Sequence, residues 1–583
     1  MRYFRIPRFT GIEAHRSDVD RGVLRICEGA VPAPVGSLRS GPVWTAFTGS
    51  TPSPSDGGIS TFIDSENNGY QMAGGVGVSG DEVVTGIHVN PNQSVIPVKV
   101  GGSLVAQDTD SVTGSTPYIS DVGNNTVFVG TGTDVKKVTF ASGSHTIDTL
   151  TKSTGYYQME NDVFPSCHSF VVGMNKTIFA AGDSSNPLRV YVSEPATVET
   201  PVREGVYSKD YLSKIDILCT NATKITALST YQNYVVVHTD AGVVLLFQTK
   251  ASTQSMHGFR AEQVAGAANS GAINPNVVSG SALIQPYYLG CDGQIWKDES
   301  ARRGPDHKPT YSDSDQVSWK AKGAWNKLVA TDISSAFSAY EPSTGHYLVG
   351  VPTKEAQDEV SGAPEYATYV WNDMSDSLAG PFVLPKMTCM ASVPDSSIMV
   401  GVDQADKVYY TDLEDMRDGA EFSSVSTPAN WDASVDPGGD RVAVNKTTPS
   451  FDYYGRTIPS SMGDLAVGTT GSPDSYYPDS YVSVMETAYE DFGSSSNMKQ
   501  WHELILSFRK NSWGNLWVYA QAEDGTLVSG QYKGSVYGKE KIKTFINLRG
   551  RRMKFRIIMV THKEHPWMIT EVGVGYLEGK VYT

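Results

Sequence analysis

The sequence predicts an all-β protein, made of a β-propeller of about six blades, a C-terminal β-sandwich and an extended N-terminal arm. The composition is the first indication, because 56 Gly and 30 Tyr stand against only 19% charged residues. Apolar runs joined by tight Gly, Asp or Asn turns recur along the chain, and strongly alternating runs fill its last part. Turn formers combined with β-branched and aromatic residues favour many short strands over helices.

Residues 1–75 are expected to form the arm. Pro and Gly interrupt short apolar runs such as 23–26 and 31–35. Pro at this density is typical of extended backbone outside the interior of a sheet. We therefore expect a ribbon that lies on another domain or subunit, followed by a loop over residues 46–75, which are rich in Ser, Thr, Pro and Gly.

Residues 76–425 are expected to form the propeller. In this range, six apolar runs are each followed by a tight turn and a second apolar run, which predicts six hairpins. The turns fall near residues 132, 184, 241, 292, 344 and 404. The spacing is roughly 50–60 residues, which is about the length of a four-stranded blade with its loops.

Residues 481–583 are expected to form the sandwich. The run 552–559 alternates, which places Arg552, Lys554 and Arg556 on one face of a strand and the apolar residues between them on the other. The basic face could contact nucleic acid, clamp an acidic neighbour, or simply be solvated. Because the N-terminal ribbon is also basic, we expect the two ends of the chain to lie close together and to build a subunit interface through these three residues.

Residues 426–480 are expected to be an acidic, loop-rich linker or insertion. The chain carries a net charge of −16, but Lys and Arg outnumber Asp and Glu by 13 to 7 from Trp501 onward, so residues 1–500 carry −22. Such an acidic body argues against tight binding of nucleic acid, but not against DNA passing by. We hypothesise that Asp436, Asp440, Asp474 and Asp479 line a DNA passage. The alternative is that they solvate an outer loop.

Enzymatic activity, cofactors and metals are not expected. Residues 75–80 match GxGxxG, but no strand and helix flank them as a dinucleotide site requires. Ser166-Cys-His-Ser169 places a nucleophile beside a base in the sequence. Because neighbours on a strand point to opposite faces, the two side chains are not expected to make the contact that a catalytic pair needs. The five cysteines are far apart in the sequence, which supports neither disulfides nor zinc. We also expect no signal peptide and no membrane-spanning segment.

Three stretches resemble the nozzle, or tail tubular, proteins of short-tailed bacteriophages, which are built on a β-propeller. They are residues 22–41, residues 178–193, and residues 332–340 together with 366–373. The resemblance implies a homo-oligomeric ring of six subunits in the virion tail, assembled in the host cytoplasm. It also implies contacts with a portal or adaptor and with tail fibres or other tail proteins, and passage of double-stranded DNA without sequence-specific binding.

Two other functions remain open. A host-receptor-binding or glycan-degrading tail protein would show a substrate groove with paired carboxylates. A free-standing lectin-like propeller would show closely similar blade repeats.

Overall fold

The chain folds almost entirely into β-strands. The computed structural model describes residues 2–9, 24–46, 118–416 and 480–578 with short gaps, and only the strands between 60 and 99 and between 452 and 457. These residues form strands β1 to β42 with a few short 3-10 helices and no α-helix. The predicted all-β class is therefore confirmed.

In the first part of the chain, small sheets of consecutive strands follow one another. The first sheet consists of β6 (Ser60–Ile63), β7 (Gly69–Met72), β9 (Ser94–Lys99) and β8 (Val84–Val89). The second consists of β10 (Tyr118–Gly123), β11 (Thr126–Gly130), β12 (Val135–Ala141) and β13 (Ser144–Thr149). The third consists of β15 (Ser169–Val172), β16 (Ile178–Ala181), β17 (Arg189–Val192) and β19 (Lys214–Asp216). All neighbouring strands in them are antiparallel except the parallel pair β7 and β9. A two-stranded sheet of β14 (Asp162–Val163) and β18 (Gly205–Val206) lies beside the third.

Four more small sheets follow. The fourth consists of β20 (Ile225–Tyr231), β21 (Tyr234–Thr239), β22 (Gly242–Gln248) and β23 (Phe259–Gln263), and the fifth of β24 (Ser279–Ser281), β25 (Ile284–Leu289) and β26 (Ile295–Lys297). The sixth consists of β27 (Phe337–Glu341), β28 (His346–Gln357), β29 (Pro364–Asn372) and β30 (Ser377–Phe382). The seventh consists of β31 (Met387–Ser392), β32 (Ile398–Asp403), β33 (Val408–Asp412) and β5 (Thr45–Ala46). The last strand, β5, comes from the N-terminal ribbon and joins the seventh sheet by pairing with β33.

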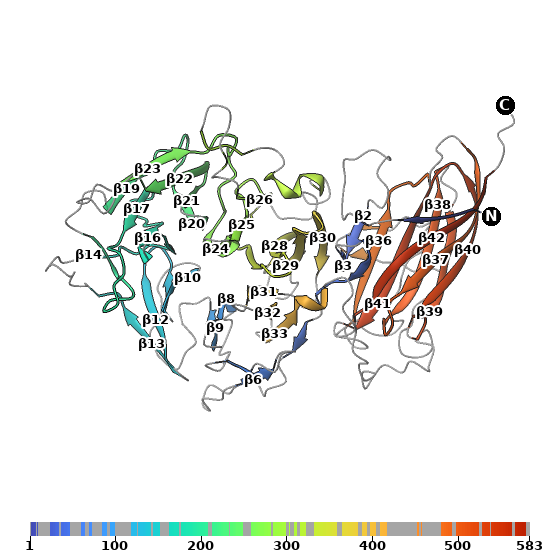
Figure 1. The fold of residues 1–583 in the computed structure, drawn as a ribbon, viewed down its shortest axis with the longest axis horizontal. Helices are drawn as coiled ribbons and strands as arrows, with labels where there is room; N and C mark the ends of the chain where they lie inside the picture. The colour runs from blue at the N-terminus through green and yellow to red at the C-terminus, as the bar shows by residue number, and fades with distance from the viewer. Residues whose placement is uncertain are drawn as a thin grey trace.

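The small sheets stand around a common centre (Figure 1). One strand of each sheet contacts the corresponding strand of the next, in the order β8, β10, β15, β20, β24, β27 and β31, and β31 returns to β8. Sheets arranged radially in this way are those of a β-propeller. All six predicted hairpins are confirmed, because each predicted turn joins two paired strands.

The number of sheets differs from the expectation. Between residues 45 and 412 the described strands form seven small radial sheets, one more than the six hairpins predicted. The additional sheet contains β6 and β7, which lie in the segment 46–75 that was expected to be loop. Those strands are only four residues long and lie among Ser, Thr and Gly, so local propensity did not reveal them. They pair with each other, and β7 also pairs with β9.

Apolar side chains fill the spaces between successive sheets. Phe128 of the second sheet and Phe170 of the third meet edge to face, with ring centroids 5.1 Å apart. Phe179 of the third sheet and Phe259 of the fourth repeat this contact at 5.3 Å. Such edge-to-face aromatic pairs are favourable beyond the area that they bury.

Serine side chains on the inner strands add a second kind of contact between sheets. The backbone N–H of Phe170 donates to Ser120 Oγ of the preceding sheet at 3.2 Å. One sheet further on, the N–H of Leu228 donates to Ser169 Oγ at 2.9 Å. All four residues are buried, so each hydroxyl satisfies a backbone donor that has left water.

Two larger sheets form the other end of the molecule (Figure 1). The first contains β3 (Ala30–Pro32), β4 (Leu38–Ser40), β42 (Met568–Glu578), β37 (Lys499–Phe508) and β40 (Lys541–Gly550), with β1 (Arg2–Ile6) paired to β42. The second contains β2 (Leu24–Glu28), β36 (Ser480–Thr487), β41 (Met553–His562), β38 (Asn515–Ala522) and β39 (Leu527–Ser535). Apolar side chains of both sheets, among them Trp501 and Val518, belong to one buried core.

The N-terminal ribbon lies on the C-terminal sheets, as expected. Strand β1 pairs with β42, β4 pairs with β42, and β2 pairs with β36. The expectation that the ribbon stays outside sheet interiors was wrong, because β2 lies between β30 and β36. Its five residues contain no Pro, so every backbone N–H is present, and Pro32 falls in β3 at the edge of the other sheet.

Strand β2 also connects the two halves of the molecule. Cys27 pairs with Gly380 of β30, the last strand of the sixth small sheet. The backbone N–H of Gly29 donates to the carbonyl of Pro381 at 3.1 Å. A nine-stranded sheet therefore runs without a break from the propeller into the C-terminal part.

Candidate interaction surfaces

Lys554 and Arg556 lie in β41, and Arg552 directly precedes the strand. Met553, Phe555 and Ile557 are buried in the core, as the alternation indicated, whereas Arg552 and Lys554 are partly exposed and Arg556 is buried. Strand β41 lies beside β36 in the sheet, and this pairing places Arg556 directly opposite Glu486 of β36.

Glu486 holds two of the three basic side chains. Its Oε2 accepts from Arg556 Nε at 2.7 Å, and its Oε1 accepts from Lys554 Nζ at 3.0 Å. Glu486 and Arg556 are both buried, and Lys554 Nζ also lies 5.5 Å from the centre of the Tyr489 ring. The acidic neighbour that these residues clamp therefore lies in the same chain. An interface role for Arg552, Lys554 and Arg556 stays a prediction.

The four predicted acidic residues of the DNA passage cannot be placed. Asp436, Asp440, Asp474 and Asp479 lie outside the described residues. Within the expected linker 426–480, the described residues include a short hairpin of β34 (Asp452–Tyr453) and β35 (Arg456–Thr457). The lining role stays a prediction.

The motif Ser166-Cys-His-Ser169 serves the packing of the third sheet. The ring nitrogens of His168 lie 3.0 Å from the carbonyl oxygens of Gly182 and Thr226, and burial lowers the pKa of the ring. The ring packs on Gly182, where a Cβ would come within 2.1 Å of it. Burial also raises the pKa of Cys167, which keeps the thiol protonated and a poor nucleophile.

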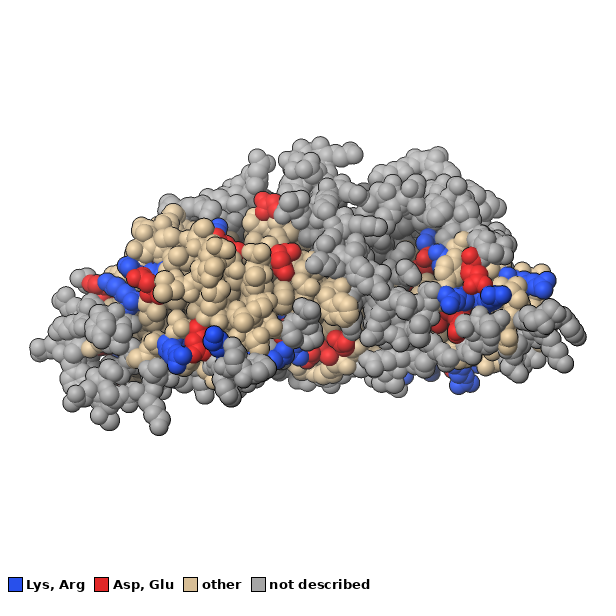
Figure 2. All heavy atoms as spheres, turned by 90° about the horizontal axis from the view of Figure 1, so that it is seen from above, with Lys and Arg blue, Asp and Glu red and all other residues tan. Residues whose placement is uncertain are grey.

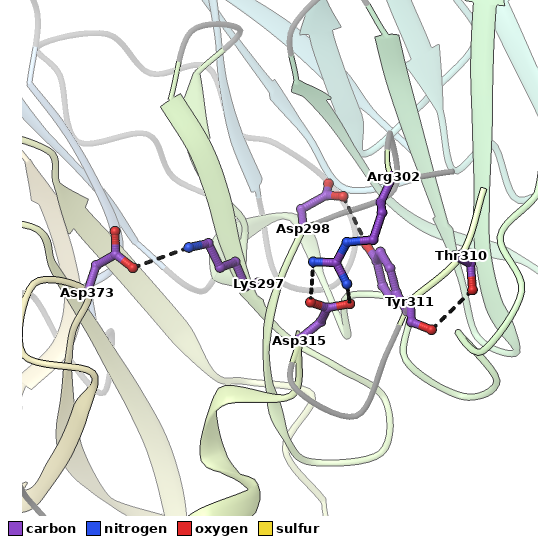
Figure 3. Close-up of polar contacts among 7 residues, drawn as sticks. All are labelled: Lys297, Asp298, Arg302, Thr310, Tyr311, Asp315 and Asp373. Atoms are coloured by element: carbon purple, nitrogen blue, oxygen red, sulfur yellow. Dashed lines mark hydrogen bonds and ion pairs between the residues drawn. The ribbon is translucent and has the colours of Figure 1, made fainter. Parts of the chain in front are cut away.

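A polar cluster completes the fifth small sheet, which has only three described strands (Figure 3). The guanidinium of Arg302 donates two hydrogen bonds of 2.8 Å each to Asp315. The hydroxyl of Tyr311 donates to Asp298 at 2.9 Å. Burial raises the pKa of Tyr311, so the hydroxyl stays protonated and can donate. The ring of Tyr311 stacks on Trp296 of β26 at 5.7 Å. The cluster therefore holds Arg302, Tyr311 and Asp315 against the sheet.

The same region is tied to the sixth sheet. Lys297 of β26 lies 3.3 Å from Asp373, as Figure 3 shows. The hydroxyl of Tyr287 donates to the same carboxylate at 2.5 Å. Both contacts hold the Asp373 carboxylate between the fifth and sixth sheets, and they do not place a nucleophile beside a base.

A polar cleft of about 590 Å³ opens beside the third sheet. It is lined by the turn after β16, the turn after β11, and strands β14 and β18. Asp183 is its most constrained acid. Burial opposes its ionisation, but hydrogen bonds from Asn186, Tyr191 and two backbone N–H groups outweigh burial and lower its pKa. Asp162 and Lys214 face each other across 4.0 Å at the cleft.

The cleft can offer hydroxyl and amide groups to a neutral polar ligand, since Thr133, Ser166, Ser184 and Asn186 line it. The carboxylate of Asp183 is already occupied by its neighbours, so it is not available as a general base. Over the described part of the chain, no group of His, Cys, Asp and Glu could hold a metal ion. The described residues also contain no helix with the length and apolar character needed to cross a bilayer.

Sequence reasoning missed the apolar side chains that are most exposed. Among the described residues, Val198 is 97%, Leu218 86% and Phe545 72% exposed. For Phe545 the sequence itself contained a signal of exposure. Along β40 the exposed positions are Lys541, Lys543, Asn547 and Arg549, and Phe545 occupies the same alternating face.

The fold defines an all-β protein with a propeller, and comparison with known proteins adds little to this class. No protein-family model matches the chain, and no curated protein matches it. Among solved structures, the chain is similar to the β-propeller domain of Cps50 (Swd1) from Myceliophteria thermophila. The match has 10% identity and a TM-score of 0.27, and covers 64% of this chain and 93% of that one. A likeness of this size carries no argument about function.

Proposed function

We propose that the chain is a non-enzymatic structural subunit of the tail of a short-tailed bacteriophage, part of the ring through which DNA leaves the particle. The resemblance of residues 22–41, residues 178–193, and residues 332–340 together with 366–373 to nozzle proteins supports this role. The observation that carries the proposal furthest is the nine-stranded sheet, in which β2 joins the sixth small sheet to the C-terminal sheets.

The finer architecture belongs to the same proposal. The seven small sheets are the blades of one closed propeller, and β5 closes it by adding a strand to the last blade. The two C-terminal sheets form a β-sandwich around the core that contains Trp501 and Val518. A continuous sheet fixes the propeller relative to the C-terminal sheets, which suits a part of a multi-subunit conduit better than a hinge does.

The electrostatics support the same role. In the proposed ring, each copy contributes an acidic body, and residues 1–500 carry −22. Like charge repels phosphates over about a Debye length, roughly 8 Å at physiological salt, so a duplex can pass without adhering. A portal or adaptor on one side and other tail proteins on the other complete the conduit. The polar clusters at Glu486, Asp183 and Asp315 are occupied within the chain, which supports a scaffold rather than an enzyme.

A particle made without this chain tests the proposal. We expect phage particles assembled without it to lack the tail ring and to be non-infectious, and the purified full-length chain to restore infectivity when added back. A cryo-EM map of the complete particle would place the chain around the DNA path. Infectious particles that lack the chain would contradict the proposal.

Glycan binding is a second candidate, and the polar cleft favours it. Its lining of Thr133, Ser166, Ser184 and Asn186 matches the hydroxyl groups of a sugar, although no exposed aromatic ring lines it for stacking. A glycan array with the purified chain, and with a Ser184→Trp variant that fills the cleft, tests this. Binding that is lost in the variant would establish it, and an empty array would remove it.

A further inference from the structure

The series of small sheets ends in a short strand. Neighbouring sheets contact each other through their inner strands, so each sheet is held mainly by the two sheets beside it. In the seventh sheet β5 supplies the last strand, but only Thr45 and Ala46 pair with β33. On the face drawn in Figure 2, the described surface of the small sheets is mostly uncharged, so surface ion pairs add little there. The ring of sheets therefore gains stability from any contact that joins sheets which are not neighbours.

One segment of the chain lies inside the ring of inner strands. Residues 272–278 directly precede β24 and contain the 3-10 helix η3 (Pro275–Val277). The segment is tied to the fifth sheet, because the N–H of Ile273 donates to the carbonyl of Leu289 in β25 at 3.0 Å. η3 contacts β20 of the fourth sheet and β27 of the sixth, and it also contacts β10 of the second. The second sheet is a neighbour of neither the fifth nor the sixth, so the segment reaches across the centre of the ring.

Asn274 fastens this segment to the sixth sheet. The residue is buried, and its Nδ2 donates to the carbonyl oxygens of Ser334 at 2.8 Å and of Ala336 at 2.9 Å. Both carbonyls lie just before β27, the inner strand of that sheet. Its Oδ1 accepts from the N–H of Val277 at 3.2 Å, which caps η3. One amide side chain thus shapes the segment with its oxygen and holds the sixth sheet with its nitrogen.

Two hydroxyl groups of the sixth sheet bind the same segment. The hydroxyl of Tyr347, a buried residue of β28, donates to the carbonyl of Val277 at 2.9 Å. The hydroxyl of Ser338 in β27 donates to the carbonyl of Asn276 at 3.3 Å. Buried backbone carbonyls need hydrogen-bond partners, and side chains of the sixth sheet supply them here. The segment is therefore bonded to two sheets and in contact with two more.

We propose that residues 272–278, the central brace, act as a conformational lock on the ring of small sheets. In an array where each unit contacts only its neighbours, units can open one after another. The central brace bonds the fifth sheet to the sixth and reaches the second, so it couples sheets that are not neighbours. Opening one of these sheets then disturbs the others, and the ring opens as one unit. The inference concerns the chain by itself and does not depend on the proposed tail role.

Hydrogen exchange by mass spectrometry on two variants of the full-length chain tests the central brace. Asn274→Ala removes the cap and both bonds to the sixth sheet. Asn274→Ser keeps a hydroxyl that can cap η3 but is too short to reach the carbonyls of Ser334 and Ala336. Both variants should exchange the amides of β27 and β10 about tenfold faster than the wild-type chain, as the loss of one net hydrogen bond does. The distant strand β10 is the decisive readout, because a purely local cap would leave it unchanged.

Asn186→Ala provides the matched control. Asn186 donates to Asp183 within one turn of the third sheet, so its loss should speed exchange in that turn and leave β10 as it is. Tyr347→Phe is a milder variant that removes one hydrogen bond to the central brace and keeps the shape of the side chain. It should change the exchange of β10 in the same direction by a smaller factor. Three outcomes would overturn the inference: β10 protected as in the wild-type chain in every brace variant, protection restored by Asn274→Ser, or protection lost equally in Asn186→Ala.

Discussion

The propeller and the C-terminal sheets bury their apolar residues over very different distances along the chain. Each small sheet is built mainly from consecutive strands, and apolar side chains such as Phe128 and Phe170 fill the gap between neighbouring sheets. The C-terminal sheets instead combine β1 to β4 with β36 to β42, so their strands come from both ends of the sequence.

The two regions also differ in their buried titratable groups. Both bury an ion pair, Glu486 with Arg556 in the C-terminal part and Arg203 with Glu194 at 3.7 Å in the propeller. The propeller in addition buries neutral histidines, among them His346, whose Nε2 accepts from Asn372 at 2.7 Å. The comparison teaches that the propeller depends on keeping a proton away from these histidines as well as on keeping charges together. Four measurements test this contrast.

Mild acid should destabilise the propeller first. Burial lowers the pKa of both His238 and His346 to about 3, and nearby Arg39 adds to the effect at His346. An unfolded histidine takes up its proton near pH 6.5, so the stability is fully present above that pH and is lost as the pH falls towards the folded pKa. Each histidine should cost about 1.4 kcal/mol per pH unit below 6.5. Hydrogen exchange by mass spectrometry between pH 7 and 5 would resolve the two regions.

A His238→Gln, His346→Gln double variant is the control for the acid effect. Its propeller should show a smaller dependence on pH over the same window. An unchanged slope, or C-terminal sheets that open before the propeller, would contradict the assignment.

Removing one partner of the buried ion pair should destabilise the C-terminal sheets. Glu486→Ala leaves Arg556 buried without its carboxylate, which costs about 3–5 kcal/mol. Replacing both residues with Met should recover much of this loss, because Arg556 is then no longer a buried charge without its partner, and Lys554 is only partly buried. Denaturant unfolding of both variants measures the difference. A loss below about 1 kcal/mol for Glu486→Ala would show that the pair is not needed.

Removing a serine that bridges two small sheets should have a moderate effect. Ser169→Ala takes away the acceptor of the Leu228 N–H, and an unsatisfied buried donor costs about 1–3 kcal/mol. Ser120→Ala should cost a similar amount through Phe170, and Ser185→Ala, in an exposed turn, almost nothing. Equal effects at all three positions in denaturant unfolding would argue against the bridging role.

The smallest effect is expected at the contact between the fifth and sixth sheets. The Lys297 and Asp373 side chains are both partly exposed, and exposed ion pairs contribute about 0–1 kcal/mol. Lys297→Ala should therefore shift the denaturation midpoint only slightly, and high salt should reduce the difference further. A large loss would mean that the two sheets depend on this pair more than on their apolar packing.

The local features could be predicted from the sequence because their partners are close along the chain. The hairpin of β21 and β22 places two apolar runs on either side of one turn, so turn chemistry alone identifies it. The alternation of Arg552, Lys554 and Arg556 against Met553 and Phe555 was readable for the same reason, since it depends only on the period of a strand.

The remaining features depend on pairing between distant segments. Nothing near Arg556 indicates Glu486, because the ladder of β36 and β41 brings them together across 70 residues. Likewise, the hairpin of β6 and β7 joins its sheet only through the pairing of β7 with β9 further along the chain. The exposed Phe545 is the exception, since a single phenylalanine at the polar positions of an alternating run was visible in the sequence.

The placement of the N-terminal ribbon also has a consequence for synthesis in the cell. The ribbon is made first, but β1 and β4 pair with β42, whose first residue is Met568. At roughly 5–20 residues per second, the ribbon waits on the order of a minute for its partner to leave the ribosome. A chain whose translation stops early cannot order these strands. Only copies translated through β42 can therefore complete the first C-terminal sheet.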